Sequence, residues 1–396
     1  MRVTTRRLTP AAIIVATGVI LAGCAPTTPG GDVEVGAPVP VAIITSQTGP
    51  LAAYGEAYLN GFEAGLDYAT NGTGTVDGRE LDITYLDDAG DADKAVTLAK
   101  DVIGQGTQII AGTASSGIAL ALAEQAAQNE ILYISGPAAA DAITGVNEYT
   151  FRSGRQTYQD VATAGTFIGD PDGKSVTVFA QDTAFGQGNV AAVDAVLGAQ
   201  GATVTSVLVP EDATEFTPFA QQVLGTGADL VFVAWAGATS GAMWQALSQQ
   251  GVFDEMPVVT GLGDIATYGA YGAASEDISF LSHYFGGAAG TDAEAAMIAS
   301  LEEAGHEADL FSPDGFTAAQ MIVQAVRDGD DTVDGMIAAL EGWEFDGVKG
   351  GYTIRADDHA LIQPMFQAKL VADGDSFVPE LVEVVDADTV TPPVAG

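Results

Sequence analysis

The sequence predicts an α/β protein with two doubly wound, mostly parallel sheets, and three observations support this prediction. Short apolar runs rich in β-branched residues alternate with alanine-rich segments whose apolar residues recur every three or four positions. Strands that alternate with helices build mostly parallel sheets covered by helices on both faces. The alternation repeats on both sides of residues 151–155, and a length of 396 residues suits two compact units better than one.

The expected elements follow one another along the chain. The helices are best defined at residues 118–128 and 188–200, where alanine is frequent and apolar residues share one face. Residues 151–155, Phe-Arg-Ser-Gly-Arg, mark the boundary between two similar units. The chain after residue 373 is acidic and contains prolines, so we expect residues 386–396 to be loose. The runs that predict strands are residues 41–45, 81–86, 108–111, 131–135, 175–180, 203–209, 229–235, 257–260 and 278–284.

The charge balance excludes several classes of function. The chain contains 53 Asp and Glu residues against 13 Lys and Arg residues, which gives a formal net charge of −40. Nucleic acids and anionic membrane surfaces are bound through basic faces, so neither is an expected partner. Hydrophobic residues make up 47% of the chain, which predicts a folded core rather than disorder.

The N-terminus carries the features of an export signal. Arg2, Arg6 and Arg7 precede an apolar run at residues 11–21, which suits the core of a signal peptide and is too short to span a bilayer. The run is followed by Ala-Gly-Cys, which ends at Cys24 and resembles the bacterial lipobox. No later apolar stretch approaches the length of a membrane span.

The lipobox resemblance implies that a signal peptide, residues 1–23, is removed and that Cys24 is acylated. We therefore expect an extracytoplasmic lipoprotein anchored to the cell membrane, with a flexible tether at residues 24–40 rich in Pro, Gly and Thr. The alternative for Cys24 is a buried structural cysteine. As the single cysteine of the chain, it excludes an intramolecular disulfide and a cysteine-based zinc cluster.

Two loops in the first half are candidate anion-binding positions. Ser115 and Ser116 lie between an expected strand and an expected helix, so their hydroxyls and the free N–H groups of the helix would converge on one small anion. The alternative is that one serine only caps the helix. The loop that contains Ala138 and Ala139 follows the next strand, so the two loops should be neighbours at one edge of the sheet.

One loop in the second half is a further candidate. Residues 182–188 follow an expected strand and precede a helix, and they offer Phe185 as an aromatic platform. The alternative is that Phe185 is a hydrophobic staple at the start of the helix. The glycines of this loop form only a GxG pattern, which supports nucleotide binding poorly. We expect no cofactor.

Catalytic and metal-binding patterns are scarce. The histidines His283, His306 and His359 are scattered, and the chain contains no HExxH or GxSxG pattern. We expect His359 to lie in an exposed turn. The sequence therefore predicts a protein that is not an enzyme and has no metal centre.

Five separated motifs lie at residues 45–61, with the core TGPLAAYGE, and at residues 86–88, 115–117, 151–152 and 182–188. Together they resemble the branched-chain amino acid type of periplasmic binding proteins, which are type 1 solute-binding receptors of ABC transporters. The resemblance runs in the same order from about residue 41 to residue 370. It implies two α/β lobes joined by three crossovers, with a ligand held in the cleft and closure by hinge bending.

The same resemblance implies roles for individual residues. It places a ligand carboxylate at Ser116, with Ser115 beside it, and a helping backbone group at Ala138. It also places an aromatic wall at Tyr54 in the first lobe and a closing aromatic at Phe185 in the second.

Other positions are candidates or depart from the family pattern. Trp235 and Asp264 follow later strands of the second lobe and are candidates by location. Ala139 replaces a common threonine, Gln156 lies near a common acid, and Gly263 falls where an amine-binding glutamate is expected. A buried ammonium without a carboxylate partner is unfavourable, so these departures argue against an α-amino acid ligand.

A positively charged residue near the boundary is a further candidate. Arg155 either faces the cleft and pairs with a second ligand anion or is an exposed hinge arginine.

We therefore expect a monomeric receptor that captures a small carboxylate-bearing solute, an amino acid or a related compound, and delivers it to the permease of an ABC importer. The alternatives are a ligand-sensing module for a signalling partner and an enzyme. The expected first lobe is residues 41–154 plus about 286–347. The expected second lobe is residues 155–285 plus about 348–385.

Overall fold

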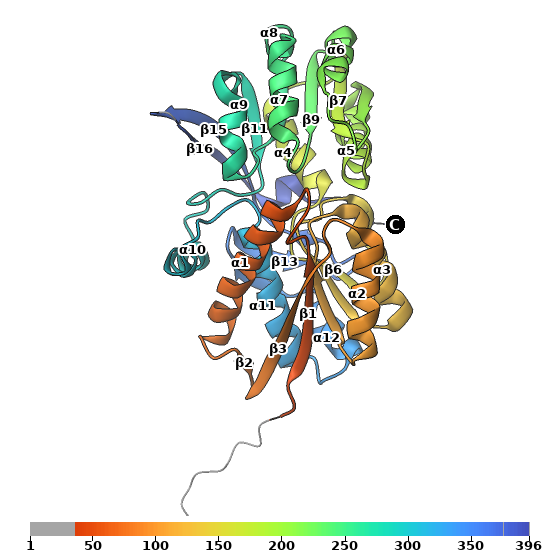
Figure 1. Cartoon of the computed structure of the whole chain (residues 1–396), viewed down its shortest axis with the longest axis vertical. Coiled ribbons are helices and arrows are strands. Elements are labelled where there is room, and N and C mark those ends of the chain that lie inside the picture. The colour runs from red at the N-terminus through yellow and green to blue at the C-terminus, as the bar shows by residue number, and fades with distance from the viewer. Residues whose placement is uncertain (1–35, 375, 396) are drawn as a thin grey trace, which may run out of the picture. The chain divides into compact units, whose positions relative to one another are not determined.

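A computed structural model describes residues 36–374 and 376–395. The chain forms two large sheets, each at the centre of one lobe and each flanked by helices (Figure 1). The predicted α/β fold with two lobes is confirmed. The predicted signal peptide and Cys24 lie outside the described residues, as does most of the tether.

The first lobe contains a mostly parallel sheet. Its elements are β1 (Val39–Thr45), α1 (Ala52–Thr70), β2 (Thr75–Val76), β3 (Arg79–Asp87), α2 (Ala92–Gly104), β4 (Ile109–Gly112), α3 (Ser116–Asn129), β5 (Leu132–Ser135) and β6 (Thr150–Arg152). The strand order is β2-β3-β1-β4-β5-β6, and only the β2–β3 pair is antiparallel. Strands β4 and β5 are buried along their whole length, which explains why their sequences are continuous apolar runs.

The second lobe follows β6 without a long connection. Its elements are α4 (Thr157–Ile168), β7 (Ser175–Gln181), α5 (Ala184–Val196), β8 (Thr203–Val209), α6 (Thr217–Thr226), β9 (Leu230–Ala234), α7 (Ser240–Gln249), α8 (Val252–Glu255), β10 (Val258–Gly261), α9 (Tyr268–Tyr271) and β11 (Ile278–Ser282). These five strands pair in parallel in the order β11-β10-β9-β7-β8. The sheet is extended beyond β11 by strands from the end of the chain.

The chain then returns to the first lobe and crosses once more. The returning elements are α10 (Asp292–Ala304), α11 (Ser312–Asp328), α12 (Val333–Leu340), β12 (Glu344–Gly347), β13 (Gly350–Ile354) and β14 (Leu361–Ile362), and the last strands are β15 (Met365–Asp373) and β16 (Ser376–Val385). Strands β12, β13 and β14 form a small antiparallel sheet. Strand β15 pairs antiparallel with β11, and β16 pairs with β15 at the edge of the second sheet.

All nine predicted strands are confirmed. They correspond to β1, β3, β4, β5, β7, β8, β9, β10 and β11, and the two predicted helices correspond to α3 and α5. The predicted helix at residues 188–200 begins at Ala184, and its last three residues form a separate 3-10 turn.

The lobe boundaries that we predicted remain a proposal, and the third connection lies further along the chain than expected. Ile354 and Leu361 pack in the same core cluster as Ile43 and Phe151 of the first sheet. The chain therefore joins the second sheet only at Met365, through residues 363–364.

Residues 386–395 make specific contacts, although their composition led us to expect a loose tail. The Arg355 guanidinium donates to the carbonyl oxygens of Pro392 and Pro393, and the Ala395 N–H donates to Asp358. Val390 is fully buried. The Arg355 side chain binds the backbone of this segment, and backbone contacts leave no pattern in the segment's sequence. Composition alone therefore could not predict that the segment is fixed.

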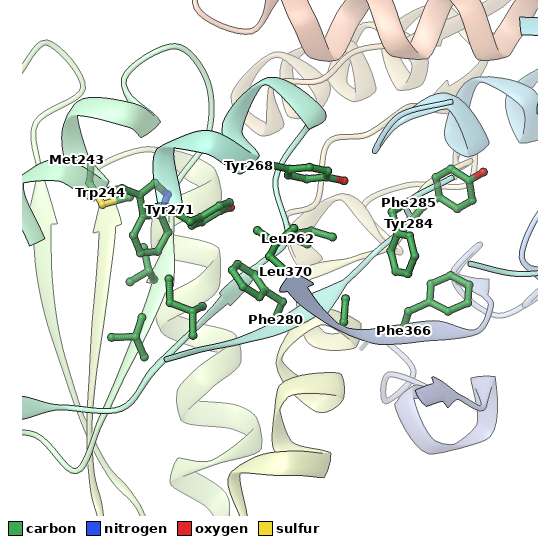
Figure 2. Close-up of a cluster of buried hydrophobic side chains, with 14 of the residues drawn as sticks. Met243, Trp244, Leu262, Tyr268, Tyr271, Phe280, Tyr284, Phe285, Phe366 and Leu370 are labelled. Carbon is green, nitrogen blue, oxygen red and sulfur yellow. The ribbon is translucent and has the colours of Figure 1, made fainter. Parts of the chain in front are cut away.

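Large aromatic side chains fill the core of the second lobe (Figure 2). The Tyr271 ring lies 4.9 Å from the Phe280 ring and 4.9 Å from the Trp244 ring. These residues come from α9, β11 and α7, and each is at most 4% exposed. Their packing fixes the segment between β10 and β11 against the sheet.

Helices α1 and α11 of the first lobe approach each other at backbone distance. A Cβ atom on Gly61 of α1 would lie 1.9 Å from the carbonyl oxygen of Ser312. No side chain fits in this space, so a glycine is required where the two helices cross.

This close approach predicts that Gly61→Ala is destabilising. The added methyl group must push α1 away from α11, which should lower the free energy of unfolding by about 1–3 kcal/mol or more. Urea denaturation followed by circular dichroism measures this loss. Gly225→Ala in α6 is a matched control, because nothing lies within 4 Å of the added Cβ atom and the change should stabilise by about 0.4–1 kcal/mol. Equal effects of the two substitutions would contradict the packing argument.

Candidate functional site

A cavity of about 390 Å³ is lined by residues of both lobes. Its walls are formed by the segments that follow the carboxyl ends of the parallel strands, from β1 and β4 in the first lobe to β7, β9 and β10 in the second. This is where ligands bind in open α/β sheets. The cavity is therefore the candidate ligand site.

The N-terminus of α3 forms one wall of this cavity. Ser115 and Ser116 both line it. Ser115 occupies the N-cap position with extended backbone angles, but its side chain caps no N–H group of the helix. The Ser116 Oγ accepts a hydrogen bond of 3.2 Å from the Ala140 N–H, which leaves the hydroxyl proton of Ser116 free to donate.

Two further helices begin at the cavity, but their N-cap hydroxyls already accept hydrogen bonds within the protein. In α5 the Thr183 Oγ1 accepts from the Gly186 N–H at 3.1 Å. In α7 the Thr239 Oγ1 accepts from the Trp235 Nε1 at 3.0 Å. Of the three N-cap hydroxyls, only that of Ser115 has no hydrogen-bond partner among the described residues, and it lies at the positive end of the α3 dipole.

Aromatic side chains form the apolar walls. Tyr54 and Phe311 pack edge to face with centroids 4.9 Å apart, and Phe185 and Trp235 line the cavity from the second lobe. The hydrogen bond to Thr239 fixes the plane of the Trp235 indole. These rings suit a flat apolar group on a ligand.

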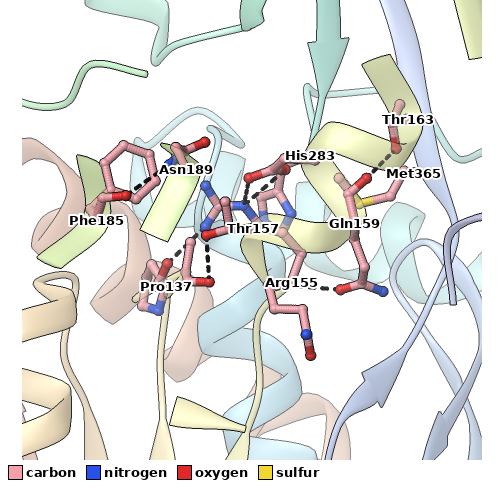
Figure 3. Close-up of polar contacts among 12 residues, drawn as sticks. Pro137, Arg155, Thr157, Gln159, Thr163, Phe185, Asn189, His283 and Met365 are labelled. Carbon is pink, nitrogen blue, oxygen red and sulfur yellow. Dashed lines mark hydrogen bonds and ion pairs between the residues drawn. The ribbon is translucent and has the colours of Figure 1, made fainter. Parts of the chain in front are cut away.

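Arg155 and Asp160 form a charged corner of the cavity. The Arg155 Nε lies 3.3 Å from Oδ1 and 3.2 Å from Oδ2 of Asp160, and the Arg155 Nη1 donates to the Pro137 carbonyl oxygen at 2.8 Å (Figure 3). The guanidinium carbon is 5.4 Å from the centroid of the Phe311 ring. Burial raises the pKa of Asp160, and the positive charge of Arg155 acts in the opposite direction.

A buried cluster of ionisable groups lies behind this corner, and one of its members, His283, also lines the cavity. The His283 Nε2 is 2.8 Å from Asp314 Oδ1, at ion-pair distance but outside hydrogen-bond geometry, and the Lys349 Nζ is 3.4 Å from His283 Nδ1. Burial lowers the pKa of His283 well below its ordinary value, so the imidazole is neutral at pH 7. Burial also raises the pKa of Asp314 to about 7 and lowers the pKa of Lys349 to about 7.

The two lobes touch at the mouth of the cavity. The Ala238 N–H of the second lobe donates to the Pro50 carbonyl oxygen of the first lobe at 3.1 Å. The Gly237 N–H donates to the Tyr54 hydroxyl at 3.3 Å, and burial raises the pKa of that hydroxyl. The described structure therefore has the lobes in contact on the open side of the site.

Seven of the nine predicted ligand-binding residues line the cavity. These are Tyr54, Ser115, Ser116, Ala139, Arg155, Phe185 and Trp235. Arg155 is 8% exposed, so it is not the exposed hinge arginine of the alternative interpretation. Their contacts with a ligand remain predictions.

The other two predicted residues do not line the cavity. The Ala138 N–H donates to the Thr113 carbonyl oxygen, and the Ala138 carbonyl oxygen accepts from Arg152 at 2.6 Å. Asp264 accepts from the Thr267 N–H and so caps a short 3-10 helix.

Three polar or aromatic lining residues at or beside the charged corner, Asp160, His283 and Phe311, are among those absent from the prediction. Asp160 lies in the first turn of α4, and His283 follows the end of β11. The rule that sites form at the carboxyl ends of strands could have found His283. Phe311 precedes α11, far from any strand end, and no pattern in the sequence indicates its position.

The prediction for His359 was wrong. His359 is 5% exposed, and its ring stacks on Phe151 with centroids 3.8 Å apart. Its Nδ1 lies 3.0 Å from the Thr150 carbonyl oxygen, and its Nε2 lies 3.2 Å from Glu341. The polar residues around His359 suggested exposure. Its aromatic partner, Phe151, is distant in the chain, so no local pattern indicated the stacking.

Across residues 36–374 and 376–395, no group of three or more acidic, histidine or cysteine side chains is arranged to hold a metal ion. Within the same ranges no helix has both the length and the apolar character needed to cross a membrane.

The burial of Lys349 predicts a pH dependence of stability. The ordinary pKa of lysine is about 10.4, so between pH 7 and 10 the unfolded chain holds a proton that the native amine has lost, and stability from this group rises with pH. We expect the free energy of unfolding of Lys349→Met to compare most favourably with that of the wild type near pH 7. This difference in stability should shrink toward pH 10. Chemical denaturation at several pH values measures it.

The exposed Lys369, which pairs with Glu380, provides a matched control. Lys369→Met should give a difference in unfolding free energy that stays constant over this range. A constant difference for Lys349→Met as well would contradict the assignment of a low pKa.

Comparisons with known proteins agree with this architecture. Residues 38–375 match the family described as periplasmic binding protein. A Leu/Ile/Val-binding protein of Rhizobium johnstonii is 28% identical over 200 residues, which cover 50% of this chain and 54% of that protein, so the match spans about half of each.

Two solved structures extend the likeness over nearly the whole chain. One is described as an ABC-type branched-chain amino acid transporter from Rhodopseudomonas palustris and is 31% identical, with a TM-score of 0.75 and coverage of 90% of this chain and 99% of that chain. Another, a solute-binding protein of an ABC transporter from R. palustris in complex with 4-hydroxybenzoate, is 20% identical and has the same fold, with a TM-score of 0.80 and coverage of 89% and 97%. The chain therefore belongs to the periplasmic binding protein family, the solute-binding receptors of ABC transporters, as the resemblance in its sequence predicted.

Proposed function

We propose that this receptor captures a small organic carboxylate between its lobes and delivers it, chemically unchanged, to the permease of an ABC importer. The observation that carries the proposal is the N-terminus of α3, where the side chain of Ser115 caps nothing and the Ser116 proton is free. Free N–H groups, the helix dipole and two hydroxyls favour an anionic oxygen group at this point.

The cavity supports a carboxylate better than a zwitterionic amino acid. Two carboxylates line it, and of these Asp160 is already paired with Arg155 while Glu211 is exposed. Gly263 and Ala139 also line it, and neither offers a side chain to an ammonium group. A buried ammonium would lack a dedicated partner, which is unfavourable.

The known ligands of similar proteins span both possibilities. One relative is named a Leu/Ile/Val-binding protein, and one structural neighbour holds 4-hydroxybenzoate. A carboxylate group is common to these ligands. The aromatic walls formed by Tyr54, Phe185 and Trp235 favour an apolar or aromatic body attached to it.

Cellular context completes the proposal. An extracytoplasmic monomer held at the membrane by acylated Cys24 would present the closed, loaded lobes to the permease. The lobe boundaries are part of the same proposal, with the third connection moved from about residue 348 to residues 363–364 because Ile354 and Leu361 pack with the first sheet.

The site predicts that Ser115→Ala and Ser116→Ala weaken carboxylate binding. Each substitution removes a hydroxyl available to the anion, which should reduce the binding free energy by about 1–3 kcal/mol if the bond is charge-assisted. Isothermal titration calorimetry with benzoate and with 4-methylpentanoate measures the change. Unchanged affinity in both variants would exclude the α3 terminus as the anion site.

A capping residue outside the cavity separates stability from binding. The Thr332 Oγ1 accepts from the Gly335 N–H and so caps α12. Thr332→Ala should lower stability by about 1 kcal/mol and leave affinity unchanged. Ser115→Ala should show the reverse pattern, because its hydroxyl caps nothing.

The contact at the mouth predicts that Gly237→Ala opposes closure. A Cβ atom at this position would lie 2.6 Å from the Pro50 carbonyl oxygen, and the residue has a φ of +81°, which L side chains rarely adopt. The lobes could not reach their described contact, so affinity should fall. Small-angle scattering with and without solute should show a smaller contraction than in the wild type.

Gly241→Ala in α7 is the matched control, because its Cβ atom would meet only the Ala270 side chain at 3.7 Å. This variant should bind and contract normally. A Gly237→Ala variant that also contracts fully would show that the mouth contact does not limit closure.

A further inference from the structure

The charged corner of the cavity has hydrogen-bonding capacity that the protein does not use. Arg155 carries five N–H donors. Its described contacts engage Nε with Asp160 and Nη1 with the Pro137 carbonyl oxygen. Among the described residues, none accepts a hydrogen bond from Nη2.

Both members of the pair are open to the cavity. Arg155 and Asp160 both line it, although their side chains are only 10% and 8% exposed. Neither Arg155 Nη2 nor Asp160 Oδ2 is a fully buried atom without a hydrogen-bond partner. Both atoms therefore keep some accessible surface, and Asp160 Oδ2 has lone pairs to spare beside its 3.2 Å contact with the Arg155 Nε.

The pair is held rigidly. The Pro137 carbonyl oxygen fixes one end of the guanidinium at 2.8 Å, and the Phe311 ring lies 5.4 Å from its central carbon. Asp160 holds the Nε side at 3.2 Å. A group fixed by three contacts loses little conformational entropy when it binds a ligand.

An unpaired donor beside a carboxylate oxygen with lone pairs to spare selects one kind of polar group. A hydroxyl accepts from Arg155 and donates to Asp160, so it satisfies both. A second carboxylate accepts from Arg155 but is repelled by Asp160, and an ammonium is repelled by Arg155. A methyl group would bury both polar atoms without partners.

We propose that Arg155 and Asp160 form a hydroxyl-binding subsite, and that the solute is an aromatic carboxylate bearing a ring hydroxyl. Its carboxylate lies at the α3 terminus, its ring lies against the aromatic walls and its hydroxyl lies between Arg155 and Asp160. The inference rests on the proposed function and names the solute class for the same site.

Calorimetric titration of the full-length protein tests the subsite with five probes. These are benzoate, 3-hydroxybenzoate, 4-hydroxybenzoate, 4-methylbenzoate and terephthalate. At least one hydroxybenzoate should bind about 10-fold or more tightly than benzoate, because a site built to hydrogen-bond a hydroxyl discriminates strongly against its absence. 4-Methylbenzoate and terephthalate should bind more weakly than benzoate.

The Asp160→Asn variant should gain affinity for terephthalate, and a misfolded protein could not show such a gain. The new amide keeps an oxygen for Arg155 Nε but turns an N–H₂ donor toward the cavity, and the negative charge is lost. The preference for the hydroxyl should therefore fall, while terephthalate should bind at least about 10-fold more tightly than to the wild type. Glu303→Gln removes an exposed carboxylate of α10 that does not line the cavity, and it should leave the wild-type order unchanged.

The outcomes separate the subsite from the function. If benzoate binds as tightly as both hydroxybenzoates, or if Asp160→Asn does not favour terephthalate, the hydroxyl subsite is wrong and the carboxylate receptor stands. If no probe and no aliphatic carboxylate binds, or if leucine binds and the hydroxybenzoates do not, the proposed solute class fails as well.

Discussion

The joint between the lobes depends on one buried cluster of ionisable groups. Arg155 belongs to the first connection, His283 to the second, and Lys349 lies at the tip of the β12–β13 hairpin near Met365, where the third connection ends. Asp160 pairs with Arg155, and Asp314 lies at ion-pair distance from His283. Removing one member of the Arg155–Asp160 pair would leave an uncompensated buried charge, which is strongly destabilising. Three of these side chains, those of Arg155, Asp160 and His283, also line the cavity, so the site and the joint cannot be changed independently.

The sequence predicted the parallel core of both lobes because buried parallel strands leave continuous apolar runs. The runs that became β4, β5 and β9 are buried over their whole length. The β15–β16 hairpin escaped prediction because β16 is an exposed edge strand, in which Leu381, Val382 and Val384 are all accessible. Its polar and apolar residues carry no clear alternation.

The sequence predicted lining residues that directly follow a strand. It did not predict residues that tertiary contacts alone bring to the cavity. Ser115 and Phe185 were placed by that rule, and they line the cavity. The rule also suggested Asp264, which turns away to cap a helix, since a capping carboxylate and a ligand carboxylate have the same local pattern. Phe311 is brought to the cavity by the return of the chain from the second lobe, which no local pattern encodes.

The C-terminal segment adds a fourth tie between the lobes within the described residues. It leaves the second sheet at Val385 and ends on Arg355, Asp358 and Gly145, which belong to the first lobe. Seen mechanically, it is a strap of fixed contour length with one end attached to each moving part. If the lobes separate, this segment must extend or lose its hydrogen bonds to Arg355. Its length therefore limits how far the lobes can open while those bonds persist.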